Sequence, residues 1–135
     1  MVEIIPAACL AIATIMGEAG NEPFEGKLAV ASVIRNRMEQ KYTSDGTVAG
    51  TVLYPKQFSM WNTTDKARLW ACSFPADHPK AQECARAWEQ SAISRPVGDS
   101  VLYHADYIDA PIWARSALTE FVRQIGRHRF FRVKA

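Results

Sequence analysis

The sequence predicts a mainly helical α+β domain with a small antiparallel sheet. Two observations predict this class: apolar residues recur at three- and four-residue spacing in long segments, and Pro and Gly stand singly at the ends of those segments. A length of 135 residues with 48% hydrophobic residues suffices for one packed core, so we expect a single domain over residues 1–135. The composition excludes disordered, collagen-like and disulfide-scaffold chains.

The first predicted helix starts at Pro6 and runs to about Met16, where Gly17–Asn21 supplies stop signals. The apolar run Ile4–Met16 is too short to cross a membrane and follows Glu3 instead of a cationic flank. We therefore expect neither a signal peptide nor a membrane anchor.

A second helix is predicted from a cap at Asn21 or Glu22, with Pro23 at its first position, to about Gln40. Its apolar stripe consists of Phe24, Leu28, Ala31, Ile34 and Met38. The basic residues off that stripe are Lys27, Arg35 and Arg37. This pattern predicts an amphipathic helix that packs on one side.

The middle of the chain alternates between turn signals and short elements. Thr47–Leu53 is predicted to form one or two helical turns that end before Pro55, and Gln57–Trp61 a short strand. A further helix is predicted from Pro79 to a point before Pro96.

The last third is predicted as a strand, a helix and a strand. Val101–His104 and Phe130–Val133 have the composition of strands. Between them, a helix over about Ile112–Ile125 would be closed by Gly126. Its inward residues would be Leu118, Val122 and Ile125.

The cysteine pattern favours free thiols. Cys9 lies in an apolar run and is predicted to be a core residue, whereas Cys72 and Cys84 are close enough in sequence to pair across a short loop. The spacing of Cys72, His78 and Cys84 lacks the close ligand pairs of a structural zinc site. We expect no metal and no cofactor.

Glu18 is the strongest candidate for catalysis. It lies among small residues at the predicted C-terminal end of the first helix. The negative end of the helix dipole and an apolar environment both favour the protonated carboxyl, which is the form that a general acid in glycosidic-bond cleavage needs. The alternative is a polar helix end without a catalytic role. For Glu22 we favour a structural role in the first turn of the second helix.

Several motifs occur in the order found in the cell wall hydrolases related to spore cortex-lytic enzymes. The longest, at residues 16–37, reads MGEAGNEPFEGKLAVASVIRNR. The others are YPKQFS at 54–59, YHA at 103–105, PIW at 111–113 and IGRHRFF at 125–131. The chain resembles this family over nearly its whole length, with one departure at Gly20 and Asn21, where the family more often has Arg-Gly.

This resemblance implies a lysozyme-like fold that acts on the glycan strands of peptidoglycan, with Glu18 as the catalytic acid. It favours a lytic transglycosylase that cleaves the β-1,4 bond between N-acetylmuramic acid and N-acetylglucosamine and gives 1,6-anhydro products. The substrate-binding residues that we predict are Glu25, Gln57, Phe58, Ser59, Tyr103, His104 and Trp113. Phe58 as a core residue and His104 as a structural histidine are open alternatives, Trp61 is a further candidate for stacking on sugar, and Asn36 and Arg37 are predicted to brace the acid's helix.

Three alternatives stay open. A hydrolytic muramidase needs a second carboxylate. Its candidates are Glu25, Asp45, Asp65, Asp106 and Asp109. A metal hydrolase using His78, His104, His128 and Asp106 lacks a supporting ligand motif. The third is a non-enzymatic module that binds nucleic acid or the wall through Arg123–Lys134.

The charge distribution suggests a partner. The net charge is only +2, but Arg115–Ala135 holds six basic residues and one acid, which suits a polyanionic wall. The expected partner is peptidoglycan, without nucleic acid or membrane insertion, and we expect a monomer. The expectation for location is a stand-alone lysin of the phage endolysin kind, made in the cytoplasm and released to the wall by a holin-type factor. An exported bacterial enzyme whose leader has been removed is the alternative.

Overall fold

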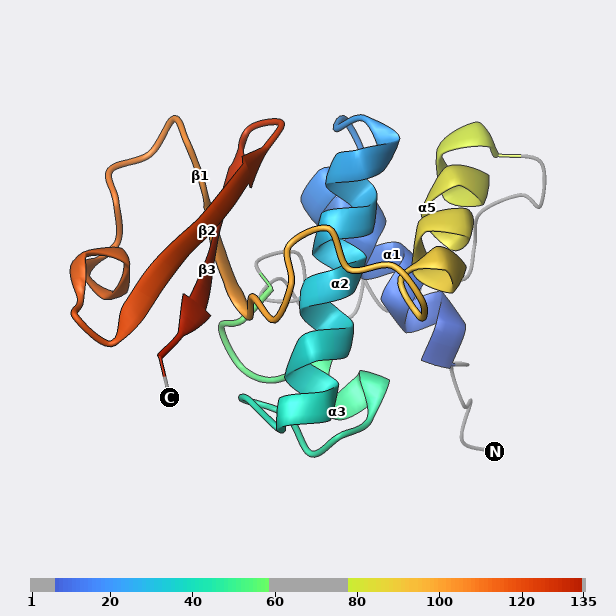
Figure 1. Ribbon diagram of the computed structural model, residues 1–135. Coiled ribbons are helices and arrows are strands. Elements are labelled where there is room, and N and C mark those ends of the chain that lie inside the picture. The colour runs from blue at the N-terminus through green and yellow to red at the C-terminus, as the bar shows by residue number, and fades with distance from the viewer. Residues whose placement is uncertain (1–6, 59–77, 135) are drawn as a thin grey trace.

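Helices lie beside a small sheet in the computed structural model, which describes residues 7–58 and 78–134. Figure 1 shows α2 between the sheet on one side and α1 and α5 on the other. The helices are α1 (Ala7–Ala19), α2 (Phe24–Gln40), α3 (Val48–Val52) and α5 (Pro79–Gln90). The strands are β1 (Leu102–Ala105), β2 (Thr119–Ile125) and β3 (His128–Val133), and the short 3-10 helix η2 spans Ile112–Arg115.

The first helix extends further than its sequence predicts. α1 continues to Ala19, so Glu18 lies in its last turn, at the C-terminal end where the sequence places it. A side chain at Gly20 would meet the carbonyl oxygen of Met16 at 2.4 Å, so the chain bends away from α1 where only glycine fits closely. The predicted α3 is confirmed and is capped by Thr47, whose hydroxyl accepts from the backbone N–H of Gly50.

The prediction that α2 packs on one side only is wrong. Lys27 and Arg37 are each 3% exposed, and Arg35 lies over the ring of Trp88. α2 is the central helix and has neighbours on several sides. These neighbours bury Lys27 and Arg37 and partly bury Arg35, which the apolar pattern of a single helix cannot predict. Each finds hydrogen-bond acceptors there, as buried charges must.

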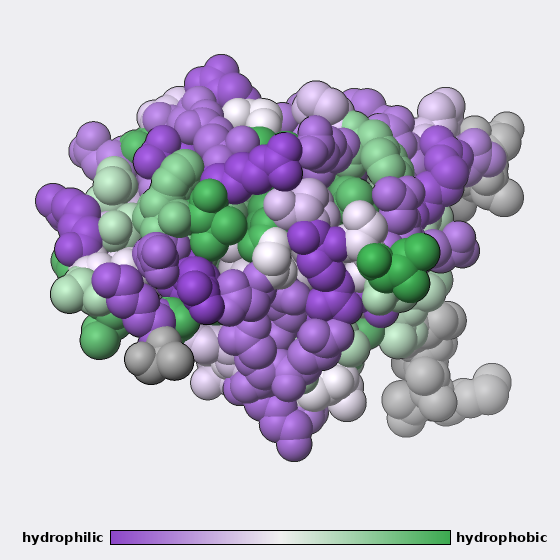
Figure 2. Space-filling view, in the orientation of Figure 1, coloured by the Kyte–Doolittle hydropathy of each residue, from purple (hydrophilic) through white to green (hydrophobic). Residues whose placement is uncertain are grey.

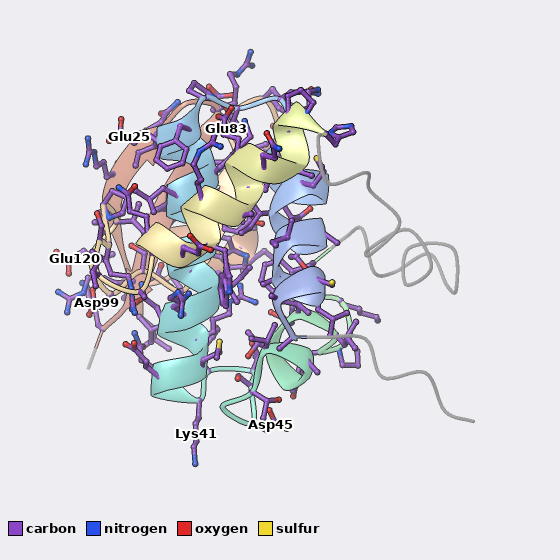
Figure 3. All side chains as sticks on the ribbon, turned by 90° about the vertical axis from the view of Figure 1, so that its right-hand side faces the viewer. Glu25, Lys41, Asp45, Glu83, Asp99 and Glu120 are labelled. Atoms are coloured by element: carbon purple, nitrogen blue, oxygen red, sulfur yellow. The ribbon has the colours of Figure 1, made fainter. Side chains whose placement is uncertain are left out.

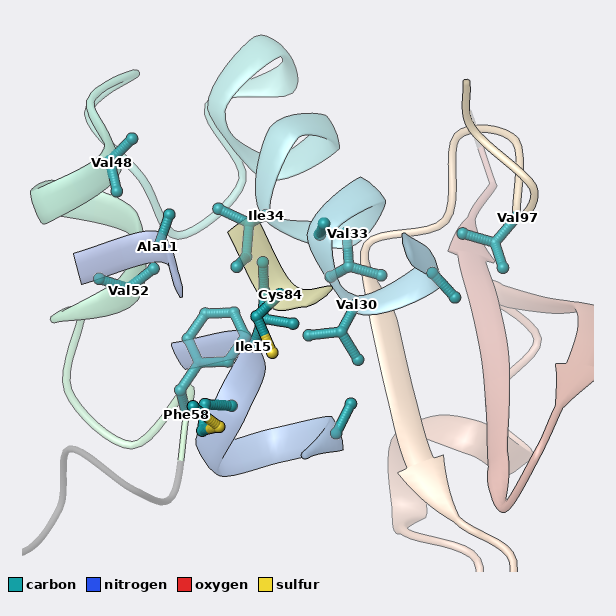
Figure 4. Close-up of a cluster of buried hydrophobic side chains, with 14 of the residues drawn as sticks. Ala11, Ile15, Val30, Val33, Ile34, Val48, Val52, Phe58, Cys84 and Val97 are labelled. Atoms are coloured by element: carbon teal, nitrogen blue, oxygen red, sulfur yellow. The ribbon is translucent and has the colours of Figure 1, made fainter. Parts of the chain in front are cut away.

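The core lies where α1, α2 and α5 meet. Figure 4 shows Phe58 beside Ile15 and near Cys84, and Ala11 close to Val48 and Val52 of α3. The free Cys84 is fully buried, and burial raises the pKa of its thiol to about 11.

Cys9 is disulfide-bonded, so the prediction of free thiols is wrong for this residue. Its partner lies outside the described residues. Because Cys84 is free, the suggested pairing of Cys72 with Cys84 is also wrong.

The predicted helix over Ile112–Ile125 is wrong. Only its first turn is helical, as η2, and after a bend and a turn at residues 116–118 the chain forms β2. Gly126 has a φ of +57° and begins the two-residue turn that connects β2 with β3, where a positive φ at the first central residue matches the twist of a hairpin. Leu118, at 71% exposed, does not point inward.

The sheet has the order β1-β3-β2, with every pair antiparallel and an irregularity in β2 between Phe121 and Arg123. The predicted strand Gln57–Trp61 is absent at Gln57 and Phe58, which lie in a turn and a bend, and its other residues lie outside the described part. No described helix has the length and apolar character that a membrane crossing requires.

Candidate active site

Glu18 lies at the junction of α1 with the sheet. Its side chain is partly buried, and its Oε1 accepts a 2.8 Å hydrogen bond from the hydroxyl of Tyr103 on β1. A strand residue 85 positions along the chain therefore fixes one carboxylate oxygen of the predicted acid.

A pocket of about 550 Å³ opens in front of Glu18. Its walls come from the end of α1 and the bend before α2, from the start of α5, from the loop that follows β1, and from the β2–β3 turn and the start of β3. They are Met16, Gly17, Glu18, Ala19, Gly20, Asn21, Glu22, His78, Lys80, Tyr107, Arg127 and His128. The small residues leave the approach to Glu18 open, as the sequence predicts.

Tyr103 is a hydrogen-bond donor to Glu18 at this site. Burial raises the pKa of its phenol well above the usual range, and the negative charge of Glu18 raises it further. The phenol therefore keeps its proton to a higher pH than a free tyrosine does, and in this form it donates to Glu18.

The shift in Tyr103 predicts a dependence of stability on pH. A phenol with a raised pKa in the folded state contributes stability below its unfolded pKa of about 10, and this contribution is lost as the pH rises toward the folded value. We expect Tyr103→Phe to lose less unfolding free energy than the wild type between about pH 9 and 11. Urea unfolding at several pH values measures this difference, and parallel losses in both proteins would contradict it.

Arg37 lies behind Tyr103 and connects α2 with two loops. Its Nε donates to the carbonyl of Val101 at 2.7 Å and its guanidinium to the side chain of Gln57 at 3.2 Å. The guanidinium also lies 4.9 Å from the ring centre of Phe58, which is 1% exposed. This burial favours the core alternative for Phe58. The contacts of Arg37 with Val101, Gln57 and Phe58 join α2 to the loops around them, and none of these three residues belongs to α1.

His104 lies on the opposite face of the sheet from Tyr103, because neighbouring strand residues point to opposite faces, and Trp113 of η2 packs against it there. Their ring centres are 5.7 Å apart, and Phe131 packs against both. His104 is buried. These two residues belong to an aromatic cluster that does not line the pocket at Glu18.

Of the other predicted binding residues, only Glu25 is described, and it does not line the pocket. Glu25 is exposed in the first turn of α2 and pairs with Arg123 at 3.2 Å. Ser59 and Trp61 lie outside the described residues. Tyr103 thus contacts Glu18, whereas Gln57 and Phe58 contact Arg37 and do not line the pocket. Glu25 lies on the surface.

Glu22 lines the pocket, although the sequence analysis gives it no role there. Its carboxylate accepts the backbone N–H of Arg127 at 3.0 Å, and its backbone carbonyl accepts from Lys27. Side chains at Gly26 and Gly126 would each collide with Glu22. No local sequence signal points to this contact, because Gly126 lies on a hairpin far along the chain.

A lysine lines the pocket beside Asn21. The side-chain oxygen of Asn21 accepts a 2.9 Å hydrogen bond from Nζ of Lys80 on α5. The described residues contain no group of three or more His, Cys, Asp or Glu side chains arranged to hold a metal ion.

Half of the six basic residues in the C-terminal segment are paired with acids in the part of the chain that the structure describes. Arg123, Arg127 and Arg132 form ion pairs with Glu25, Asp106 and Asp99, in that order. These exposed pairs stabilise the fold little, but they reduce the positive charge that the sheet presents. In the view of Figure 2, hydrophilic residues predominate, and hydrophobic ones gather on the left, where the sheet lies.

A family model described as cell wall hydrolase matches residues 21–131, which is most of the chain. The chain belongs to the cell wall hydrolase family. The family match begins three residues after Glu18 and includes Tyr103 and the β2–β3 turn.

A relative of the spore cortex-lytic type agrees with this membership. Over 118 residues the chain is 29% identical to a spore cortex-lytic enzyme of Oceanobacillus iheyensis, with 86% of this chain and 38% of that protein covered. The chain therefore spans less than two fifths of the length of this relative.

Two solved structures share the fold. The catalytic domain of the Bacillus cereus SleB protein matches with a TM-score of 0.72 and 24% identity over 92% of this chain and 88% of that chain. The catalytic domain of the germination-specific lytic transglycosylase SleB from Bacillus anthracis matches with a TM-score of 0.72 and 22% identity over 92% of each chain. These matches confirm the lysozyme-like α+β class.

Proposed function

We propose that this protein degrades peptidoglycan by cleaving the β-1,4 bond between N-acetylmuramic acid and N-acetylglucosamine, with Glu18 as the catalytic acid. The observation that carries the proposal is the placement of Glu18 at an open pocket, with one carboxylate oxygen held by Tyr103. Membership of the cell wall hydrolase family supports the substrate class.

The mechanism that we propose is lytic transglycosylation. Glu18 protonates the glycosidic oxygen, and the bond from this oxygen to C1 of N-acetylmuramic acid breaks. The C6 hydroxyl of the same sugar then bonds to C1 and returns its proton to Glu18. One carboxyl group thus acts first as acid and then as base, and the product carries a 1,6-anhydro ring.

The positions of the other carboxylates support this choice. A muramidase requires a second carboxylate near the scissile bond. Of the candidates within the described residues, Glu25, Asp45, Asp106 and Asp109 do not line the pocket. The additional pocket carboxylate, Glu22, is occupied by the backbone of Arg127. The Bacillus anthracis protein of the same fold is itself named a lytic transglycosylase.

Digestion of purified peptidoglycan tests the proposal. We expect mass spectra of the released muropeptides to show anhydro ends, each lighter by one water than the corresponding reducing end. Reducing ends would identify a muramidase instead, and an unchanged muropeptide profile would contradict glycan cleavage altogether.

The expectations for partners and location depend on this function. A peptidoglycan substrate places the site of action at the cell wall, and a holin-type factor or an export route would bring the protein there. The alternative binding module at Arg123–Lys134 is less favoured, because three of its arginines already pair with carboxylates.

A further inference from the structure

Glu22 occupies an unusual position for an acidic side chain. Only 12% of its side chain is exposed, and it lies in the bend between α1 and α2. Its Oε1 accepts the backbone N–H of Arg127, which belongs to the β2–β3 turn 105 residues away. Burying a carboxylate costs free energy unless its oxygens accept hydrogen bonds, so the bond from Arg127 must offset part of that cost.

The β2–β3 turn is shaped to receive this carboxylate. A side chain at Gly126 would lie 2.3 Å from Oε2 of Glu22, so the space in front of that glycine is filled by the acid. Glycine is therefore required at this position for two reasons, its positive φ and the carboxylate packed against it.

His128 lies between Glu22 and the hydrogen-bonded pair of Tyr103 and Glu18. Its Nδ1 lies 3.5 Å from Oε1 of Glu22, is buried, and has no hydrogen-bond partner within the described part of the chain. The His128 ring packs edge-on against Tyr103, with ring centres 5.0 Å apart, and Tyr103 donates to Glu18. A continuous set of contacts thus runs from Glu22 to the acid.

We propose that Glu22 is a positioning residue, whose carboxylate clamps the β2–β3 turn and His128 onto the α1–α2 bend and so holds Tyr103 within reach of Glu18. The proposal rests on the proposed function only for its effect on turnover, because the contact itself can be tested on the protein without substrate.

A mutant cycle tests the clamp through turnover. Glu22→Ala removes the carboxylate, and Gly126→Ala expels it, so each should lower kcat by about tenfold with little change in KM, as expected for a misplaced catalytic group. The double variant should show about the same tenfold loss, because both changes break one contact. A loss equal to the product of the two single losses would overturn the proposal.

Two matched controls separate the clamp from backbone strain and from the loss of charge. Gly98 has a φ of +58° and nothing within 4 Å of an added side chain, so Gly98→Ala carries the strain alone and should leave kcat unchanged. Glu22→Gln keeps an oxygen that can accept from Arg127 and should stay within about threefold of wild type. Equal losses in Gly98→Ala and Gly126→Ala would overturn the proposal.

Titration of His128 by NMR tests the contact without activity. Burial lowers the pKa of this imidazole, whereas the charges of Glu22, Glu18 and Asp106 raise it and His104 lowers it. Glu22→Gln should therefore lower the pKa of His128, because the nearest anion is removed, and Glu39→Gln on the outer face of α2 should not. An unchanged titration in Glu22→Gln would overturn the clamp even in an active enzyme. Absence of peptidoglycan cleavage by the wild type would overturn the proposed function alone.

Discussion

Replacing Glu18 by glutamine is expected to lower the rate of peptidoglycan cleavage by about 100- to 10,000-fold. The amide has no proton of suitable acidity for the leaving oxygen and cannot take one back from the C6 hydroxyl. Its oxygen can still accept from Tyr103, so the contact that joins α1 to β1 survives. The loss should therefore appear in kcat, while Tm changes little.

Release of soluble fragments from purified peptidoglycan measures this rate, and thermal unfolding measures the fold. Glu39→Gln is a matched control, because Glu39 is exposed on α2 and pairs only with surface Arg95 within the described part of the chain. We expect this control to cleave like the wild type. Wild-type rates in Glu18→Gln would show that another group is the acid.

Replacing Arg37 by methionine is expected to lower the free energy of unfolding by about 3 kcal/mol, close to 10 °C in Tm. The variant leaves the buried carbonyl of Val101 without its donor and removes the cation that packs on Phe58. Burial lowers the pKa of the Arg37 guanidinium, which shows how fully this charge has left water. Methionine fills similar space, so lost hydrogen bonds account for most of the effect.

Arg37→Lys distinguishes charge from geometry. Lysine restores a cation but cannot supply the paired donors of the planar guanidinium, so we expect only partial recovery of stability. Lys41→Gln is the surface control, because Lys41 points away from the end of α2 into solvent, as Figure 3 shows. Chemical unfolding that gives equal stabilities for wild type and Arg37→Met would disprove the stabilising role of Arg37.

Local sequence signals predict the helices well. α3 and α5 begin within a residue of their predicted starts, at Val48 and Pro79, because capping and proline rules act within a few residues. The prediction for the β2 segment is wrong because such local signals do not include pairing with another strand. The apolar residues of this segment match a helical period, and only pairing with β3 makes it a strand.

The residues of the candidate site also fall into two groups, those that local sequence signals predict and those that they do not. Glu18 is identified by its motif and by its place at the end of an apolar helix, both of which are local. Glu22 is not, because its partners Gly126, Arg127 and His128 lie on a distant hairpin. Predicted residues on β1 divide between the two faces of the sheet, so Tyr103 reaches Glu18 and His104 does not.

The sequence by itself determined the fold class and most helix positions and pointed to Glu18 as the candidate acid, because periodicity, capping and a family motif act over short stretches of chain. Tertiary structure decided which charges are buried and which carboxylate completes the pocket. Arg37 meets Val101 across 64 residues, and Glu22 meets Arg127 across 105. Burial and hydrogen bonding at such separations depend on the packing of whole elements, which no local pattern of residues contains.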